Sequence, residues 1–284
     1  MKFQEVFCNS FKAIREQLHA EVKQQVDFIL PSMPMVNACR ADEFDFFKPL
    51  LDSGDLTVDQ MHHACDRYFL GKTKTDTPMF WMIDEMFQPR DAHIGDKWIS
   101  NYLKQREPLL DSWQVTHCLF GLHLLAHTDT TDSTDIKCPA ETAEMAEIKF
   151  SKSQILDKID SCALNSFRDF CVTNKPVCVV ESEQSAVILS EILPESIWMA
   201  YATLSNLTPE LFAPLQGRTV TIYPRTDPSM STYLFFCDYA ELVRRSYPTI
   251  DLSIDQTLED KATDEQKQRC IDLLGFLMES PTNL

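Results

Sequence analysis

Two stretches of the sequence place acidic residues directly after apolar, strand-like runs. In "VCVVESEQSA", Glu181 and Glu183 follow the run 177–180, and in "GRTVTIYPRTD", Asp227 follows the run 219–223. Carboxylates at the C-terminal ends of neighbouring parallel strands meet at one edge of a sheet. Two or three carboxylates there can hold Mg²⁺ and assist phosphoryl chemistry. The sequence therefore offers Glu181 and Asp227 as candidate catalytic residues, and these two with Glu183 as candidate metal ligands.

The same residues also have a purely structural interpretation. Glu181 and Glu183 flank Ser182, a good N-cap residue, at the point where a helical pattern begins. Acidic residues in a first helical turn gain about 0.3–1 kcal/mol from the helix dipole. Asp227 precedes Pro228, a pair that commonly starts a turn. The pattern by itself favours capping for the glutamates and a turn for Asp227.

Strand-like and helical segments alternate through the second half of the chain, which indicates a parallel sheet with helices on both faces. We expect 177–181, 197–202 and 219–223 to be neighbouring parallel strands. The expected strands are 177–181, 197–202, 219–223 and 249–254, and the expected helices are 186–193, 208–217, 231–247 and 263–280.

The first half is predicted to be a smaller α+β region. A helical pattern runs over 9–30, and two short helices follow, the second with Thr57 as N-cap, Gln60 completing a capping box and Gly71 as its end. "PMFWMIDEM" is strand-like, and "HIGDKWISNYL" is a second strand or a turn. The predicted divisions are a helical segment 1–44, an α+β region 45–127, an acidic insertion with a loop and a helix 128–172, and an α/β domain 173–284.

Composition narrows the classes of function. The chain has 284 residues, a net charge of −17 and only 6 glycines, without a GxxxxGK[ST] or GxGxxG motif. We therefore expect no nucleotide cofactor. Its 10 cysteines include no CxxC pair, so we expect no zinc and buried, reduced thiols. No segment resembles a signal peptide or a membrane span, which predicts a cytoplasmic protein without membrane contact.

The net charge disfavours general nucleic-acid binding, because such binding depends on neutralising phosphates. The nearest approach to a basic patch lies within residues 90–106, where cations alternate with aromatic side chains, an arrangement that suits single strands. Acidic neighbours dilute this patch, which favours a solvated face. The candidate nucleic-acid-binding residues are Arg90, Lys97, Trp98, Lys104 and Arg106.

Three histidines lie close together in "HCLFGLHLLAH", namely His117, His123 and His127. His123 and His127 are four residues apart, which suits two metal ligands on one helix face. The glutamate of an HExxH motif is missing, because position 124 is a leucine. We expect a packing role for these rings and no metal site.

Several of these stretches together resemble a known family. "VCVVESEQSA", "IWMAYATLSNL" and "GRTVTIYPRTD" are similar to the Toprim domain of bacterial primases and topoisomerases, and more closely to a primase-related Toprim family of bacterial mobile elements. "RYFLGKTK", "MFWMIDE" and "CLFGLHLL" occur in the order of similar segments in primase catalytic cores. The resemblance covers about residues 45 to 280 and implies a Toprim-like α/β half preceded by a primase-core-like α+β half.

The resemblance transfers only part of the family's metal motif. The catalytic glutamate falls on Glu181 and the second aspartate of the Asp-x-Asp pair on Asp227, but the first aspartate falls on Arg225. The family's lysine falls on Gln184. A guanidinium is always charged, so Arg225 is expected to pair with Glu181 or Asp227 and to disrupt a Mg²⁺ site.

The resemblance therefore implies a protein of nucleic-acid metabolism or of mobile elements. We expect it to be catalytically degenerate and to act as a binding or regulatory factor, with nucleic acid at a local patch or a protein as its partner. The alternative is an active Mg²⁺-dependent nucleotidyltransferase or nuclease that uses Glu181 and Asp227.

Overall fold

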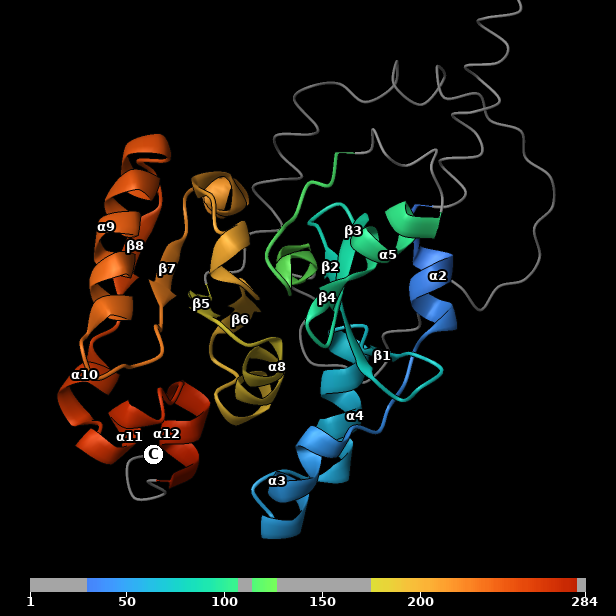
Figure 1. Ribbon diagram of the computed structural model, residues 1–284, viewed down its shortest axis with the longest axis horizontal. Helices are drawn as coiled ribbons and strands as arrows, with labels where there is room; N and C mark the ends of the chain where they lie inside the picture. Colours follow the sequence, from blue (N-terminus) through green and yellow to red (C-terminus); the bar gives the residue numbers. More distant parts are fainter. Residues whose placement is uncertain (1–29, 107–113, 127–174, 280–284) are drawn as a thin grey trace, which may run out of the picture.

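The computed structural model describes residues 30–106, 114–126 and 175–279. It contains two four-stranded sheets, one antiparallel and formed by the first half of the chain, the other parallel and formed by the second half. Figure 1 shows the sheets side by side, with α8 (Glu183–Ile192) and η3 (Leu122–Leu125) between them. The predicted helix over 9–30, except its last residue, and the whole of the predicted insertion 128–172 lie outside the described residues.

The parallel sheet confirms the predicted α/β arrangement. Its strands are β5 (Val177–Val180), β6 (Ile197–Ala200), β7 (Thr219–Ile222) and β8 (Asp251–Ile254), in the order β6-β5-β7-β8. All three neighbouring pairs are parallel, including β5 with β6 and β5 with β7. β5 and β6 are buried along their whole length, as continuous apolar runs predict for a sheet covered on both faces.

Alternate residues of the parallel strands face two different layers. Cys178 and Val180 pack with α8 and with Leu273 of α12 (Leu273–Glu279). Val177 and Val179 pack with η6 (Pro209–Leu215) and α9 (Ser231–Ser246). Helices therefore cover both faces, which is the covering that parallel strands require.

The antiparallel sheet and its helices form the first half. Thr57 Oγ1 accepts a hydrogen bond from Gln60 N and the Gln60 side chain accepts one from Thr57 N, so the predicted capping box is confirmed. The helix ends at Arg67, however, and Gly71 starts a strand, which corrects its predicted role. The elements are α2 (Met33–Ala38), η1 (Asp45–Phe47), α3 (Lys48–Ser53), α4 (Val58–Arg67), β1 (Gly71–Lys72), β2 (Pro78–Ile83), β3 (Pro89–Ile94), β4 (Lys97–Trp98) and α5 (Ile99–Arg106).

Two helices of the second half differ from the prediction. Residues 209–215 of the segment 208–217 form the 3-10 helix η6, because in an α-helix the ring of Pro214 would clash with the carbonyl group four residues earlier. The segment 263–280 is not one helix but α11 (Asp264–Gln268) and α12, separated by Cys270 with a φ of +52°. The short α10 (Thr257–Lys261) precedes them. In the described ranges, no helix has the length and apolar character needed to cross a membrane.

The two halves meet at the outer edge of β6. Phe120 and Ala200 exchange both backbone hydrogen bonds, at 2.9 and 3.1 Å, and the buried Tyr68 hydroxyl group donates to Trp198 O at 2.8 Å. Gly121 lies at this joint with a φ of +85°, and a Cβ atom there would be 2.9 Å from Trp198 O. The edge of β6 is thus sealed by the first half, and one core cluster contains residues of both halves.

The joint can be tested with two glycines of matched backbone conformation. Gly121→Ala and Gly54→Ala both place a side chain at a positive φ, +85° and +83°, but nothing lies within 4 Å of the Cβ position at Gly54. We expect Gly54→Ala to cost about 1–2 kcal/mol of unfolding free energy for the left-handed conformation. Gly121→Ala should cost about 1–3 kcal/mol more, because its Cβ overlaps a carbonyl group. Denaturant unfolding of both variants gives the difference, and equal losses would contradict close contact at β6.

Candidate functional site

The strand order reverses between β5 and β7, and we name the C-terminal edge of these two strands the crevice, after the place where ligands lie in open α/β sheets. The chain leaves β5 for β6 through α8 on one face, and returns from β6 to β7 through η6 on the other face. The connections thus depart in opposite directions from the β5–β7 pair. In open α/β sheets, ligands bind at such a reversal, beyond the C-terminal ends of the strands. Glu181 follows β5 and Arg225 follows β7, so both predicted site residues lie at this edge.

Arg225 and Glu181 form an ion pair across the crevice. Arg225 Nε lies 3.4 Å from Glu181 Oε2, and the two side chains are 43% and 24% exposed. Burial raises the pKa of Glu181 above its ordinary value, while the charge of Arg225 acts in the opposite direction. The prediction that Arg225 reaches one of the two acids is confirmed, and the acid is Glu181.

Asp227 is held by the loop that leads into α9. Its Oδ1 accepts hydrogen bonds from Ser229 N at 2.9 Å and Ser229 Oγ at 2.5 Å, and its Oδ2 accepts from Thr232 N at 2.8 Å. Ser231 donates to it as well, from N and Oγ at 3.2 Å. Burial opposes ionisation, but the hydrogen bonds from Ser229 and Thr232 hold the pKa of Asp227 well below its usual range. The geometry agrees with the turn interpretation of Asp227.

Glu183 turns toward the first half of the chain. Its Oε1 lies 2.6 Å from His93 Nδ1 of β3; the Glu183 side chain is buried, and the His93 side chain is 14% exposed. The hydrogen bond with Glu183 raises the pKa of His93, although burial opposes this. Ser182, as predicted, is the N-cap of α8, and its Oγ accepts from Ser185 N at 3.4 Å. Glu183 therefore joins α8 to the antiparallel sheet.

Two residues at this edge were not anticipated from the sequence. Asp272, in the loop before α12, accepts hydrogen bonds from Ser185 Oγ and from Gly275 N. Its negative charge also raises the pKa of Glu181. Tyr201 follows β6, and its backbone N donates to Val180 O at 3.2 Å. Its buried hydroxyl group acts on Glu181 and lowers the pKa of that acid, although the contact falls short of a well-formed hydrogen bond. In the sequence, the position of Tyr201 directly after a strand was the one sign that it could belong to the site. Asp272 gave no such sign, because the sequence pattern placed it inside a single helix over 263–280.

The carboxylates in this arrangement do not fit a Mg²⁺ ion. Glu181 is paired with Arg225, Glu183 with His93, and both oxygens of Asp227 accept protein hydrogen bonds. Within residues 30–106, 114–126 and 175–279, no group of three or more His, Cys, Asp or Glu side chains could hold a metal ion. A metal would have to displace Arg225 from Glu181.

The candidate nucleic-acid-binding residues occupy β3, β4 and α5. Arg90 is paired with Asp84, to which its Nε donates at 2.6 Å. Trp98 is stacked on His93, with ring centroids 4.8 Å apart, and so has one face covered. Arg106 lies over Tyr102, a ring that is 55% exposed. Lys97 is exposed, and Lys104 lies in the same helix as Arg106.

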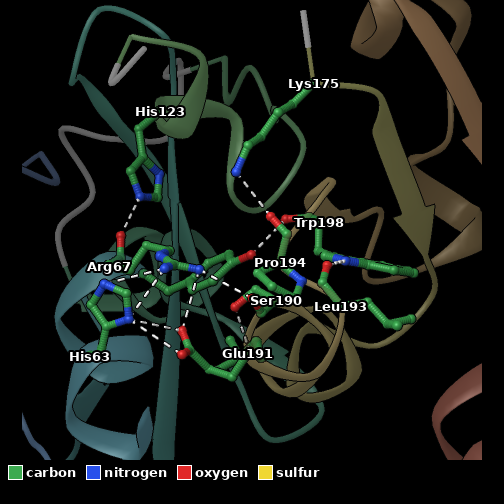
Figure 2. Close-up of polar contacts among 11 residues, drawn as sticks. His63, Arg67, His123, Lys175, Ser190, Glu191, Leu193, Pro194 and Trp198 are labelled. Carbon is green, nitrogen blue, oxygen red and sulfur yellow. Dashed lines mark hydrogen bonds and ion pairs between the residues drawn. The ribbon is translucent and has the colours of Figure 1, made fainter. Parts of the chain in front are cut away.

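The described part of the histidine cluster has a structural role. His123 is fully buried, and its Nε2 lies 2.9 Å from Arg67 O. Figure 2 shows this contact as a dashed line. Arg67 in turn pairs with Glu191 of α8 at 3.3 Å and donates to Ser190 O. His127 lies outside the described residues. The predicted packing role is thus seen for His123, which joins η3 to α4, while Arg67 joins α4 to α8.

Comparison with known proteins adds one partial match. Residues 169–226 match the model of a family described as "Domain of unknown function (DUF6371)". No curated protein matches the chain. The matched segment contains Glu181 and Arg225, so it includes both sides of the crevice.

The ion pair of His93 with Glu183 predicts a pH-dependent stability. Because the folded-state pKa of His93 is raised, the pair stabilises fully below the ordinary value of 6.5, and its contribution is lost as the pH rises through the folded-state pKa. His93→Gln should therefore lower the unfolding free energy by about 1–3 kcal/mol near pH 6, and by less at alkaline pH. Denaturant unfolding at several pH values measures this.

His62→Gln is the matched control, since His62, on α4, makes no hydrogen bond or ion pair with the described residues. This variant should lose little unfolding free energy at either pH. A loss in His93→Gln that stays constant with pH would show a neutral hydrogen bond instead of an ion pair.

Proposed function

We propose that this chain is a Toprim-like, primase-related protein of nucleic-acid metabolism that has lost its catalytic metal and acts as a binding or regulatory factor. The resemblance of "VCVVESEQSA" and "GRTVTIYPRTD" to Toprim motifs supports the family. The α/β half with Glu181 at the C-terminal edge of its parallel sheet agrees with that resemblance.

The observation that carries the loss of metal is the contact between Arg225 and Glu181. A guanidinium 3.4 Å from the carboxylate supplies the positive charge that Mg²⁺ would otherwise bring. Asp227, the other transferred acid, is engaged by Ser229, Ser231 and Thr232. A protein with these contacts gains little from a metal ion, so the proposed role is binding and not phosphoryl transfer.

The partner is proposed to be single-stranded nucleic acid at a local patch on β4 and α5. Lys97 and Arg106 are exposed there, and Tyr102 offers an exposed ring for stacking. Arg90 contributes less, because its charge is balanced by Asp84. The net charge of −17 keeps the expected affinity low. Residence in the cytoplasm is part of the same proposal.

Calorimetric titration with Mn²⁺ tests the loss of metal. The unmodified protein should bind weakly or not at all, because Arg225 competes for Glu181. Arg225→Asp removes this cation and adds a hard oxygen ligand, so metal affinity should rise. Arg245→Asp, with the same change of charge on the exposed end of α9, should leave the affinity low. Tight binding by the unmodified protein and by Arg225→Asp alike would favour the alternative, an active Mg²⁺-dependent enzyme that uses Glu181 and Asp227.

Titration with a single-stranded oligonucleotide at low and physiological salt tests the binding role. Binding should be weak and should fall steeply with salt, since it depends on phosphate neutralisation. The double variant Lys97→Gln/Arg106→Gln should reduce the salt slope by about 0.7 for each phosphate that is no longer neutralised. Arg244→Gln is the control, because Arg244 donates to Leu252 O on β8. Tight, salt-insensitive binding would contradict the proposed mode.

A further inference from the structure

We infer that Arg225 is a direct ligand for a phosphate group in the crevice between β5 and β7, in the position where a metal would otherwise mediate that contact. The inference deepens the proposed function and rests on it for the source of the phosphate, a nucleic-acid strand. A free phosphate ion would offer the guanidinium of Arg225 the same oxygens as a phosphate group of nucleic acid. The experiment therefore has to distinguish these two sources.

The crevice leaves one charged group with unused hydrogen-bonding capacity. Arg225 makes a single ion pair in the described ranges, through Nε, and its side chain is 43% exposed. Its terminal nitrogens have no hydrogen-bond partner among those residues. A guanidinium presents five N–H donors in a planar fork that matches phosphate geometry. Arg225 can therefore receive two phosphate oxygens.

The neighbouring acids do not compete equally for Arg225, because most are already engaged. Glu183 is bound to His93, Asp227 to the serine and threonine donors that precede and begin α9, and Asp272 to Ser185 and Gly275. Glu181 is the exception, since its ion-pair partner in the described part of the chain is Arg225 itself. If phosphate binding at the terminal nitrogens draws Arg225 away from Glu181, Glu181 is the one acid that needs a new partner.

The buried hydroxyl group of Tyr201 can be that partner. It already lies close enough to Glu181 to lower the pKa of that acid, but the contact falls short of a well-formed hydrogen bond, and burying such a group poorly paired is costly. Backbone hydrogen bonds hold the segment beside Glu181, with Tyr201 N donating to Val180 O and Ala202 N donating to Glu181 O at 3.0 Å. Burial raises the pKa of Tyr201, and the nearby charge of Glu181 raises it further. When Arg225 turns to a phosphate, a small movement lets Glu181 accept a hydrogen bond from Tyr201.

The test uses two probes, inorganic phosphate and a single-stranded decathymidylate, each titrated calorimetrically at low salt with EDTA present. The unmodified protein should bind both without metal, the oligonucleotide more tightly. Arg225→Gln should weaken both by at least roughly ten-fold, the factor expected of a charge-assisted pair. Tyr201→Phe should weaken both by roughly three- to ten-fold and leave the unfolding midpoint unchanged or higher, since its hydroxyl group lacks a well-formed hydrogen bond in the free protein. Arg245→Gln should bind like the unmodified protein.

The outcomes separate the inference from the proposed function. Oligonucleotide binding that Arg225→Gln leaves unchanged overturns the inference and retains the function, with the β4–α5 patch as the binding surface. Binding of inorganic phosphate through Arg225 without oligonucleotide binding supports the phosphate site and overturns the nucleic-acid function. Binding of neither probe overturns both. Binding that requires added Mn²⁺ also overturns the inference, because Arg225 would then not replace the metal.

Discussion

The closed edge of β6 is the constraint on which the rest of the structure depends. A parallel sheet needs cover on both faces and cannot leave a buried strand edge unpaired. Phe120 pairs with Ala200 and the Tyr68 hydroxyl donates to Trp198 O, so the first half supplies hydrogen-bond partners to this edge. Gly121 permits the close approach. At the opposite edge, Arg244 donates to Leu252 O of β8 and covers that carbonyl group from α9.

The same joint determines how the acids are used. Because β3 is held against the N-terminus of α8, His93 can pair with Glu183 and draw it away from the crevice. The loop before α9 engages Asp227 in a similar way. Glu181 and Arg225 then remain together at the reversal of strand order. The surrounding elements bind Glu183 and Asp227, and this leaves Glu181 as the acid that pairs with Arg225 in the crevice.

Polar contacts between the halves reinforce the apolar core. Arg67 of α4 reaches Glu191 and Ser190 O of α8, and His123 reaches Arg67 O (Figure 2). Buried polar groups need such partners, because an unpaired one loses its hydration without compensation. The hydroxyl of Tyr201 differs from these groups, because its contact with Glu181 falls short of a well-formed hydrogen bond.

The sequence by itself determined the parallel sheet, because strand-like runs such as 177–180 alternate with helical periodicity. It also determined the capping box at Thr57. The positions of Glu181 and Arg225 directly after neighbouring strands were likewise determined by the sequence. Local pattern cannot show which distant side chains meet. Only the tertiary structure paired Glu183 with His93 and brought Tyr201 beside Glu181. It also divided the predicted last helix at Cys270, placing Asp272 next to Ser185, since long-range contacts override helical propensity there.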